Sequence, residues 1–281
     1  MSTTYDLADL ARVALKGKTV MITGATGGIG FSTARLMYRA GCNLIVTGSN
    51  QEKMDRLLAD LVDGEGKVWS YICDLTKPKE IAHMIERSVS ECSPVDILIN
   101  NAGFALKATK PFWEQDLDDV DTVMDVNVRG LMHITHGILR YHMMKRSPQP
   151  TGTVLFVSSI TGHQAPLKDF NEASYHTSKA AVEGFAYVLR HETSGTNIRI
   201  LVHRPGTTLT EFHSRRLEYD SSSIDDMFSG MCALQADDLA EGIVWQCLQP
   251  ERVSVVTMET LPTSQRSLYQ VDRKWEERNR V

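Results

Sequence analysis

The stretch Thr19-Val20-Met21-Ile22-Thr23-Gly24-Ala25-Thr26-Gly27-Gly28-Ile29-Gly30 decides the fold of this chain. Its first five residues are apolar or β-branched, a pattern typical of a fully buried strand. The glycines follow at once, and a helical pattern then runs from Phe31 to Gly41. A strand, a glycine-rich turn and a helix in this order place backbone N–H groups and the positive end of the helix where a pyrophosphate can bind.

The spacing of the glycines defines the motif further. Gly30 is followed by three residues other than glycine, so the Gly-x-Gly-x-x-Gly pattern is absent and the pattern present is Thr-Gly-x-x-x-Gly-x-Gly. Glycines in such number cost backbone entropy, which favours a ligand that approaches the backbone closely; a glycine-rich turn without a ligand is the alternative. The residues of this turn that we expect to contact a cofactor are Gly24, Thr26, Gly28, Ile29 and Gly30.

Further strand patterns recur along the chain and alternate with helical patterns. The runs that we expect to be strands cover residues 43–47, 68–73, 96–100, 153–157, 198–202 and 253–257. Strands that alternate with helices in this way are typical of a parallel sheet covered by helices on both faces. The sequence therefore predicts an α/β fold, a single-domain, Rossmann-type doubly wound parallel sheet of about seven strands.

The two ends of the chain and one internal stretch differ from this regular part. Residues 1–16 have apolar residues at helical spacing and are predicted to form an N-terminal arm. The main domain is expected over 17–265, and the charged residues 266–281 are expected to form a tail, either a solvated helix or a subunit arm. The polar stretch around 207–232 is predicted to be a substrate loop or lid.

The end of the second strand bears on the choice of cofactor. In a dinucleotide-binding sheet this end meets the adenosine ribose, where an acidic residue would select NAD by bonding the 2′-hydroxyl. The sequence has Gly48, Ser49 and Asn50 there instead, which leave room for a 2′-phosphate, and Lys53 adds a positive charge. NADP(H) is therefore favoured over NAD(H).

A second motif, Tyr175-x-x-x-Lys179, has the composition of an acid–base catalyst. In a helix the two residues lie one turn apart on the same face. An ammonium beside a phenol lowers the phenol pKa from about 10 toward neutrality, where proton transfer is efficient. The same spacing also occurs on ordinary solvated helices, so the motif alone does not establish catalysis.

Asn127 lies among apolar residues in the middle of a helix that we expect over 118–145. A buried amide needs hydrogen-bond partners, or it costs about 1 to 3 kcal/mol. Asn127 is therefore either a functional residue or an internal cap for a kinked helix.

Composition and charge disfavour several other classes of function. The net charge is −5, from 30 Lys and Arg against 35 Asp and Glu, which disfavours nucleic acid and anionic membranes as partners. The five cysteines include no Cys-x-x-Cys pair, and His133 and His136 have no third ligand at suitable spacing, so neither a disulfide framework nor a metal site is predicted. With no signal-peptide pattern and no long apolar run, we expect a cytoplasmic protein.

Taken together, these motifs resemble the short-chain dehydrogenase/reductase family from about Lys18 to Leu261. The residues that carry the resemblance are Thr23, Gly24, Gly28, Ile29, Gly30, Asp74, Asn100, Asn101, Ala102, Gly103, Asn127, Ser159, Tyr175, Lys179, Pro205 and Gly206. The resemblance implies that Tyr175 is the general acid and base, and that Lys179 lowers its pKa and bonds the nicotinamide ribose. It further implies that Ser159 holds the substrate oxygen and that Asn127 holds a water molecule connected to Lys179.

The resemblance also implies the remaining cofactor contacts. Asp74 would bond the adenine amino group, and threonines 207, 208 and 210 would hold the carboxamide and the phosphates. The full set of expected contacts outside the glycine turn is Ser49, Asn50, Asp74, Leu75, Asn101, Ala102, Gly103, Tyr175, Lys179, Pro205, Gly206, Thr208 and Thr210. Family members of this kind are homotetramers or homodimers, so self-association is expected, with the terminal arms as candidate contacts.

Within the family, residues 205–212 and 254–263 are similar to the NADP-dependent 3-hydroxy acid dehydrogenases and to clavulanic acid dehydrogenase. The expected function is reversible hydride transfer between NADP(H) and a small polar secondary alcohol or ketone such as a 3-hydroxy acid. Two alternatives stay open: a ketoreductase for a bulkier metabolite, and a nucleotide-sensing scaffold without turnover. The interval from Ser159 to Tyr175 is a few residues longer than is usual in the family, and the expected substrate contacts are Gln164, Leu167, Lys168, Phe170, Arg204, Glu211 and Phe212. For Arg204 a surface or interface ion pair is the favoured alternative to contact with a substrate carboxylate.

Overall fold

The computed structural model of the chain describes residues 7–105, 110–167, 170–216 and 220–279. Its centre is a seven-stranded parallel sheet in the order β3-β2-β1-β4-β5-β6-β9. The strands are β1 (Thr19–Ile22), β2 (Asn43–Gly48), β3 (Val68–Ile72), β4 (Ile97–Asn100), β5 (Thr151–Val157), β6 (Asn197–Pro205) and β9 (Thr257–Thr260). The strand order turns back between β1 and β4, which is where such sheets bind ligands. The predicted fold class is confirmed.

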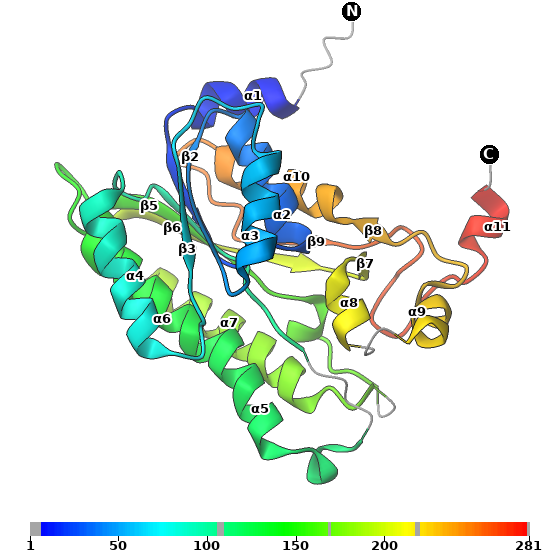
Figure 1. Cartoon of the computed structure of the whole chain (residues 1–281). Helices are drawn as coiled ribbons and strands as arrows, with labels where there is room; N and C mark the ends of the chain where they lie inside the picture. Colours follow the sequence, from blue (N-terminus) through cyan, green and yellow to red (C-terminus); the bar gives the residue numbers. More distant parts are fainter. Residues whose placement is uncertain (1–6, 106–109, 168–169, 217–219, 280–281) are drawn as a thin grey trace, which may run out of the picture.

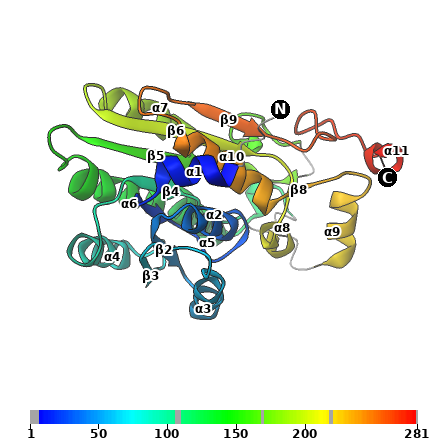
Figure 2. The same ribbon diagram turned by 90° about the horizontal axis from the view of Figure 1, so that it is seen from above.

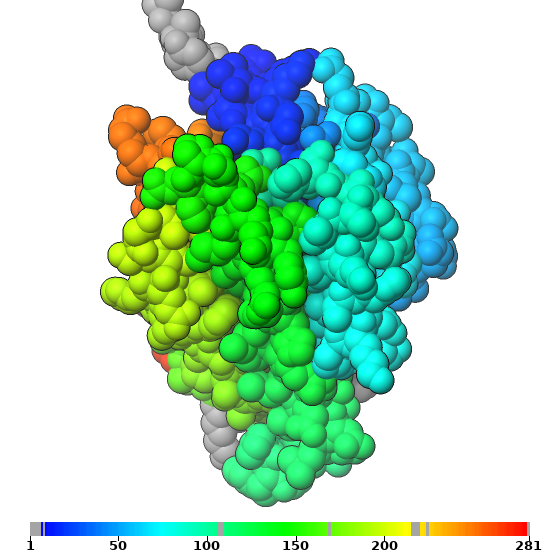
Figure 3. All heavy atoms as spheres, turned by 90° about the vertical axis from the view of Figure 1, so that its left-hand side faces the viewer, coloured from blue at the N-terminus to red at the C-terminus, as the bar shows by residue number. Residues whose placement is uncertain are grey.

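Helices cover both faces of the sheet (Figures 1 and 2). On one face lie α1 (Leu7–Leu15), α2 (Gly28–Arg39), α3 (Gln51–Asp60) and α10 (Ala236–Leu248), which share a core with β1 and β2. On the other lie α4 (Pro78–Glu91), α5 (Leu117–Met124), α6 (Leu131–Ile138) and α7 (Ala173–Glu192). Figure 3 shows α4 and the segment that contains α6 side by side on the outside of this face. None of the helices in the described part of the chain is both long and apolar enough to cross a membrane.

The described part of the predicted N-terminal arm forms helix α1, which packs against the domain. Ala11 and Leu15 are 2% and 3% exposed, and they lie in the core that α2 and α10 also build. Because the apolar face of α1 is covered within the chain, this face is not open for contact with a second subunit.

The helix expected over 118–145 is interrupted by two wider turns. After α5 the backbone forms a π-helical segment at Asp125–Gly130, continues as α6, and widens again at Leu139–Met143. Asn127 lies in the first of these segments and is 1% exposed. Such π-turns occur frequently at functional sites.

Two predicted segments differ from the structure. The last strand was expected at 253–257 but lies at Thr257–Thr260, because the carbonyl groups of Val253 and Val255 accept hydrogen bonds from the side chains of Arg199 and Gln246 at 3.1 Å each. The polar stretch 211–232 contains two short helices, α8 (Glu211–Arg216) and α9 (Ser221–Phe228), next to the small β7–β8 pair at Thr208–Leu209 and Leu234–Gln235. Part of this stretch, residues 217–219, lies outside the described residues.

Candidate functional site

A cleft of about 730 Å³ opens beyond the carboxyl ends of the strands. Its inner half is lined by the turns that follow β1, β2, β3 and β4, and its outer half by α7, α8, α9 and the segment after β9. A volume of this size is in the range of small-molecule and cofactor sites. The following paragraphs take the two halves in turn.

The glycine turn after β1 brings bare backbone to the cleft. Gly24 has φ +61°, and a Cβ atom there would lie 2.8 Å from the Cα atom of Ala102, so only glycine fits. A Cβ atom on Gly27 would meet no atom within 4 Å, which means that this backbone faces open space. The start of α2 at Gly28 follows directly. The turn therefore has the shape and the N–H donors that a pyrophosphate requires.

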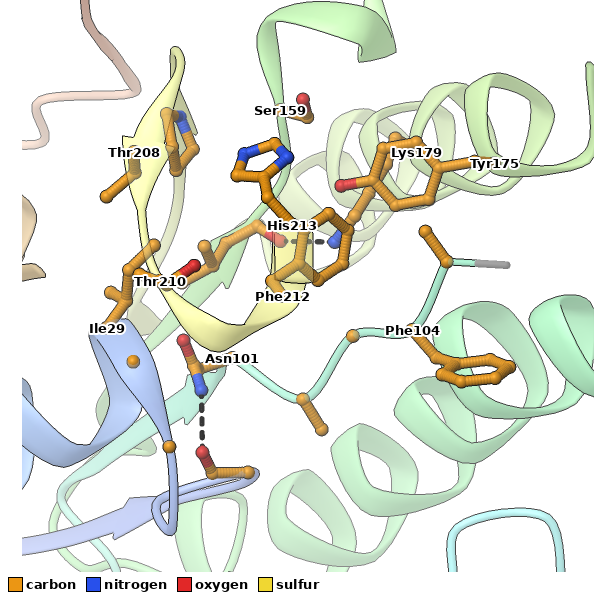
Figure 4. Close-up of a pocket in the computed structure, with 18 of the residues that line it drawn as sticks. Ile29, Asn101, Phe104, Ser159, Tyr175, Lys179, Thr208, Thr210, Phe212 and His213 are labelled. Atoms are coloured by element: carbon orange, nitrogen blue, oxygen red, sulfur yellow. Dashed lines mark hydrogen bonds between the residues drawn. The ribbon is translucent and has the colours of Figure 1, made fainter. Parts of the chain in front are cut away.

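The glycine turn is tied to the end of β4. The Asn101 side chain donates hydrogen bonds to the carbonyl oxygens of Thr23 and Gly24 at 3.0 and 3.1 Å, and the Thr23 hydroxyl accepts from the Asn101 and Ala102 backbone at 3.1 Å each. Figure 4 shows one hydrogen bond of the Asn101 side chain as a dashed line. Gly30 does not line the cleft, but a Cβ atom there would lie 2.3 Å from the Gly24 carbonyl oxygen. Glycine at position 30 is therefore required by the conformation of the turn, and Gly30 itself does not line the cleft.

The adenosine end of the cleft lies after β2 and β3. Ser49 lines the cleft, whereas the Asn50 side chain caps α3 by accepting a hydrogen bond from the Lys53 backbone at 2.9 Å and does not line it. The Lys53 ammonium forms an ion pair with Glu211 at the start of α8. Asp74 lines the cleft after β3; burial opposes its ionisation, but hydrogen bonds from Thr76 and the nearby Lys77 ammonium together keep the Asp74 pKa below its usual value.

The predicted catalytic residues come together at the middle of the cleft (Figure 4). Tyr175 and Lys179 project from α7, with the Lys179 nitrogen 5.8 Å from the centre of the Tyr175 ring. Lys179 is 4% exposed and donates a hydrogen bond of 2.9 Å to the carbonyl oxygen of Val157, at the end of β5. Burial lowers the pKa of its ammonium to about 8, and the nearby Glu183 carboxylate partly opposes this change. Ser159 follows β5 on the same side of the cleft.

Asn127 supports this arrangement from behind the cleft. Its side-chain oxygen accepts a hydrogen bond from the Phe104 backbone at 2.7 Å, and its nitrogen donates to the Phe104 carbonyl at 2.8 Å and to the Ser178 hydroxyl at 3.0 Å. The amide thus has the partners that a buried position requires, and it joins the loop after β4 to α7. The predicted contact with Lys179 through a water molecule stays a prediction.

The outer half of the cleft is largely apolar and includes residues that sequence reasoning missed. Phe212 lies 5.5 Å from the Tyr175 ring, and His213 lies 5.4 Å from Phe212, centre to centre. Figure 4 shows the His213 ring facing the same space as Tyr175 and Ser159. The missed lining residues of this half include Phe104, His213, Met227, Met231, Gln265, Leu268, Val271 and Arg273. No periodic pattern in the sequence marks them.

The C-terminal tail forms part of this outer wall. The Leu268 backbone donates a hydrogen bond to the Gln164 side chain at 2.8 Å, and the Tyr269 hydroxyl donates to the Ala165 carbonyl. Arg273 donates to the carbonyl oxygens of Met227 and Ser229 at 2.7 and 3.0 Å, at the end of α9. The tail therefore joins the long loop before α7 to helix α9.

Several expected substrate contacts need correction. Arg204 does not line the cleft and instead forms an ion pair, the favoured alternative for this residue: its guanidinium donates to both carboxylate oxygens of Glu183, at 2.8 and 2.5 Å. Gln164 is held by the tail and Leu167 is half exposed, and neither lines the cleft. Lys168 lies outside the described residues. Of the expected set, the described residues that do line the cleft are Phe170, Glu211 and Phe212.

Comparisons with known proteins agree with this site. The chain matches the family described as short chain dehydrogenase over residues 18–220. Sulfoacetaldehyde reductase 2 of Chromohalobacter salexigens is 34% identical to it, over 90% of this chain and 98% of that protein. The NADP-dependent 3-hydroxy acid dehydrogenase of Schizosaccharomyces pombe is 32% identical, over 92% and 98%. Serine 3-dehydrogenase of Agrobacterium fabrum is 32% identical, over 88% and 94%.

A solved structure gives the same result. The closed form of serine dehydrogenase complexed with NADP+ superimposes with a TM-score of 0.80 at 30% sequence identity, and the match covers 88% of this chain and 96% of that one. The family match spans more than half of the chain and includes the turns after β1 to β4 and helix α7, which line the cleft. The chain therefore belongs to the short-chain dehydrogenase/reductase family and is an NAD(P)-dependent oxidoreductase.

Proposed function

We propose that the protein catalyses reversible hydride transfer between NADP(H) and a small polar secondary alcohol or ketone, such as a 3-hydroxy acid. The observation that carries this proposal is the pair Tyr175 and Lys179 in the middle of the cleft, next to Ser159. The names of the relatives, which include 3-hydroxy acid and serine dehydrogenases, support the substrate class. The scaffold alternative is disfavoured, because it gives no reason for all these groups to gather at one point.

The roles of the chain's own groups follow from their positions. The glycine turn and Ser49, with Asp74 at the adenine end, would hold the nucleotide, and its nicotinamide ring supplies or accepts the hydride. Ser159 would donate a hydrogen bond to the substrate oxygen and stabilise developing alkoxide charge. Tyr175 would give a proton to that oxygen in reduction and remove it in oxidation. The Lys179 ammonium would stabilise the Tyr175 phenolate.

A bulkier ketone is the second candidate substrate, because the outer half of the cleft carries the apolar side chains of Phe104, Phe170, Met227 and Leu268. Titration with NADPH and NADH, followed by a panel of 3-hydroxy acids, β-keto acids and larger cyclic ketones, tests both candidates. Turnover confined to small acids would support the first, and turnover confined to large ketones the second. Tight nucleotide binding without any turnover would contradict the proposed function.

The preference for NADP over NAD is also a proposal, supported by the absence of an acidic residue at Gly48 to Asn50. Lys53 is the nearby cation, and Glu211 pairs with it. A 2′-phosphate would compete with Glu211 for this ammonium. We expect Lys53→Met to raise the Kd of NADPH about tenfold, which corresponds to about 1.4 kcal/mol, and to leave the Kd of NADH within about twofold.

Fluorescence titration of both nucleotides measures this effect, with Lys79→Met on the exposed surface of α4 as the control variant. In the same assay Glu211→Gln is expected to lower the Kd of NADPH, because the competing carboxylate is gone. Equal changes for NADPH and NADH in Lys53→Met would show that Lys53 does not contact a 2′-phosphate.

The buried position of Lys179 predicts a pH dependence. Since burial lowers its pKa to about 8, the ammonium is present below that pH and is lost as the pH rises through it. We expect kcat/KM for ketone reduction to fall as the pH rises above about 8. Steady-state rates across the neutral to alkaline range measure this; an unchanged rate up to the ordinary pKa of a lysine would contradict it.

Self-association is proposed as well. Partly exposed apolar side chains on the outer surfaces of α4, α6 and α7, namely Val89, Met132, Tyr187 and Val188, support a contact between copies of the chain. Light scattering after size-exclusion chromatography determines whether the protein is a dimer, a tetramer or a monomer.

A further inference from the structure

Helix α7 carries a third ionisable residue on the face that bears the catalytic pair. Tyr175, Lys179 and Glu183 follow one another at intervals of four residues, so their side chains lie along one side of the helix. Glu183 is 5% exposed and does not line the cleft. A buried carboxylate is costly unless it is paired and hydrogen-bonded, so its partners explain its presence.

The partners of Glu183 connect it to the end of β5. The Ser158 hydroxyl donates a hydrogen bond of 2.9 Å to Glu183, and Arg204 of β6 balances the charge through its two hydrogen bonds. Ser158 lies between Val157, whose carbonyl accepts from Lys179 at 2.9 Å, and Ser159. The carboxylate therefore holds the backbone segment that binds one catalytic residue and contains another.

The turn after Ser159 closes on the same contact. A Cβ atom on Gly162 would lie 2.8 Å from the Glu183 carboxylate oxygen and 2.8 Å from the Ser158 hydroxyl oxygen. Only glycine leaves this hydrogen bond intact, because any larger residue would push between the two groups. Three separate segments therefore contribute to the hydrogen bond between Ser158 and Glu183: the end of β5, the turn at Ile160–Gly162 and α7.

We propose that Glu183 is a positioning residue for the hydride-transfer reaction. Through Ser158 it fixes the end of β5 against α7, and it thereby sets where the Ser159 hydroxyl stands relative to Tyr175 and Lys179. This role rests on the function proposed above, and it extends the set of working residues beyond those that touch substrate or cofactor.

The charge of Glu183 acts on the same groups. It raises the pKa of Lys179 against the larger, lowering effect of burial, so it helps to keep the ammonium in place. Without the carboxylate, the unpaired guanidinium of Arg204 would act on Lys179 in the opposite direction. Two other titratable groups, Tyr187 and Glu259, act on Arg204. Glu172 and His213 line the cleft that also contains Tyr175 and Lys179.

Two variants separate the charge of Glu183 from its hydrogen bond. Glu183→Gln keeps an oxygen for Ser158 and removes the charge, whereas Ser158→Ala keeps the charge and removes the hydrogen bond. We expect Glu183→Gln to lower kcat about 10- to 100-fold, to change the Kd of NADPH less than about threefold, and to move the alkaline loss of activity to lower pH. Ser158→Ala should lower kcat and leave the pH of the alkaline loss of activity unchanged. Glu183→Asp, which keeps the carboxylate, should lose activity at the same alkaline pH as the wild type.

A second measurement does not depend on turnover. The ultraviolet absorbance of the Tyr175 phenolate, taken as the difference between each variant and the same variant with Tyr175→Phe, should titrate at higher pH in Glu183→Gln than in the wild type. Glu192→Gln, at the exposed end of the same helix, is the matched control and should change neither quantity.

Opposite results overturn the proposal. Glu183 is a structural residue if Glu183→Gln changes neither the pH of the alkaline loss of activity nor the phenolate titration, and if the unfolded fraction of the variant accounts for its loss of turnover. If Glu183→Gln does not fold, an unchanged kcat in Ser158→Ala has the same meaning. Should the wild type reduce no compound in the panel, the proposed function fails, and the phenolate titration still decides the role of Glu183.

Discussion

Tyr175→Phe is expected to lower kcat by about 10²- to 10⁴-fold while the Kd of NADPH stays within about threefold of the wild type. The change removes the hydroxyl that would transfer the proton and keeps the ring, which packs 5.5 Å from Phe212. Because a phenyl ring fills the same space, the cleft and the fold should be unaffected. Steady-state rates and NADPH fluorescence titration measure the two effects separately.

The control for this substitution is Tyr141→Phe, in the segment Leu139–Met143 and 47% exposed. It removes a hydroxyl from the surface of the protein and should leave kcat unchanged. Substantial turnover in Tyr175→Phe would mean that another group transfers the proton, and His213, which faces the same cleft, is a candidate.

Lys179→Met is expected to have opposite effects on turnover and on stability. Turnover should fall at least about 10²-fold, because the ammonium that stabilises the Tyr175 phenolate is gone. The free energy of unfolding should rise, since a pKa lowered from 10.5 to about 8 reflects an ammonium that is destabilised by burial. A shift of this size corresponds to about 3 kcal/mol, and the Val157 carbonyl that loses its donor takes back about 1 kcal/mol.

The pH dependence of this gain in the free energy of unfolding tests the explanation further. The folded state prefers neutral Lys179, so the wild type is penalised below about pH 8 and regains stability as the pH rises toward 10.5. The stability difference between Lys179→Met and the wild type should therefore be largest near neutral pH and shrink in alkaline solution. Urea unfolding at several pH values measures it, with Lys145→Met at an exposed position as the control. A loss of stability in Lys179→Met would show that the ammonium contributes more to the fold than its burial costs.

The sequence predicts the inner half of the site well because its signals are local. The glycine turn follows a buried strand directly, and Tyr175 and Lys179 are one helical turn apart, so neighbouring residues define each feature. Parallel strands then bring these local features to one edge of the sheet. The structure places all of them along one cleft.

The sequence does not predict pairings between distant segments. An ion pair was the favoured interpretation of Arg204, but the sequence did not identify its partner, because Glu183 is separated from it by 21 positions and lies on another element. Asn50 was expected at the cofactor, but its side chain caps the helix that it precedes. In both cases a hydrogen bond that the sequence alone does not reveal determines where the side chain lies.

In the outer wall of the cleft, the C-terminal tail joins the loop before α7 to helix α9. This arrangement determines which positions can be substituted without loss of the fold. Side chains such as Phe104, His213, Met227 and Leu268 line the cleft from segments outside the seven-stranded sheet. Randomised libraries at these positions should therefore yield many folded proteins with changed substrate range. Libraries at Thr23 or Asn101, whose side chains tie the end of β1 to the end of β4, should yield mostly insoluble protein.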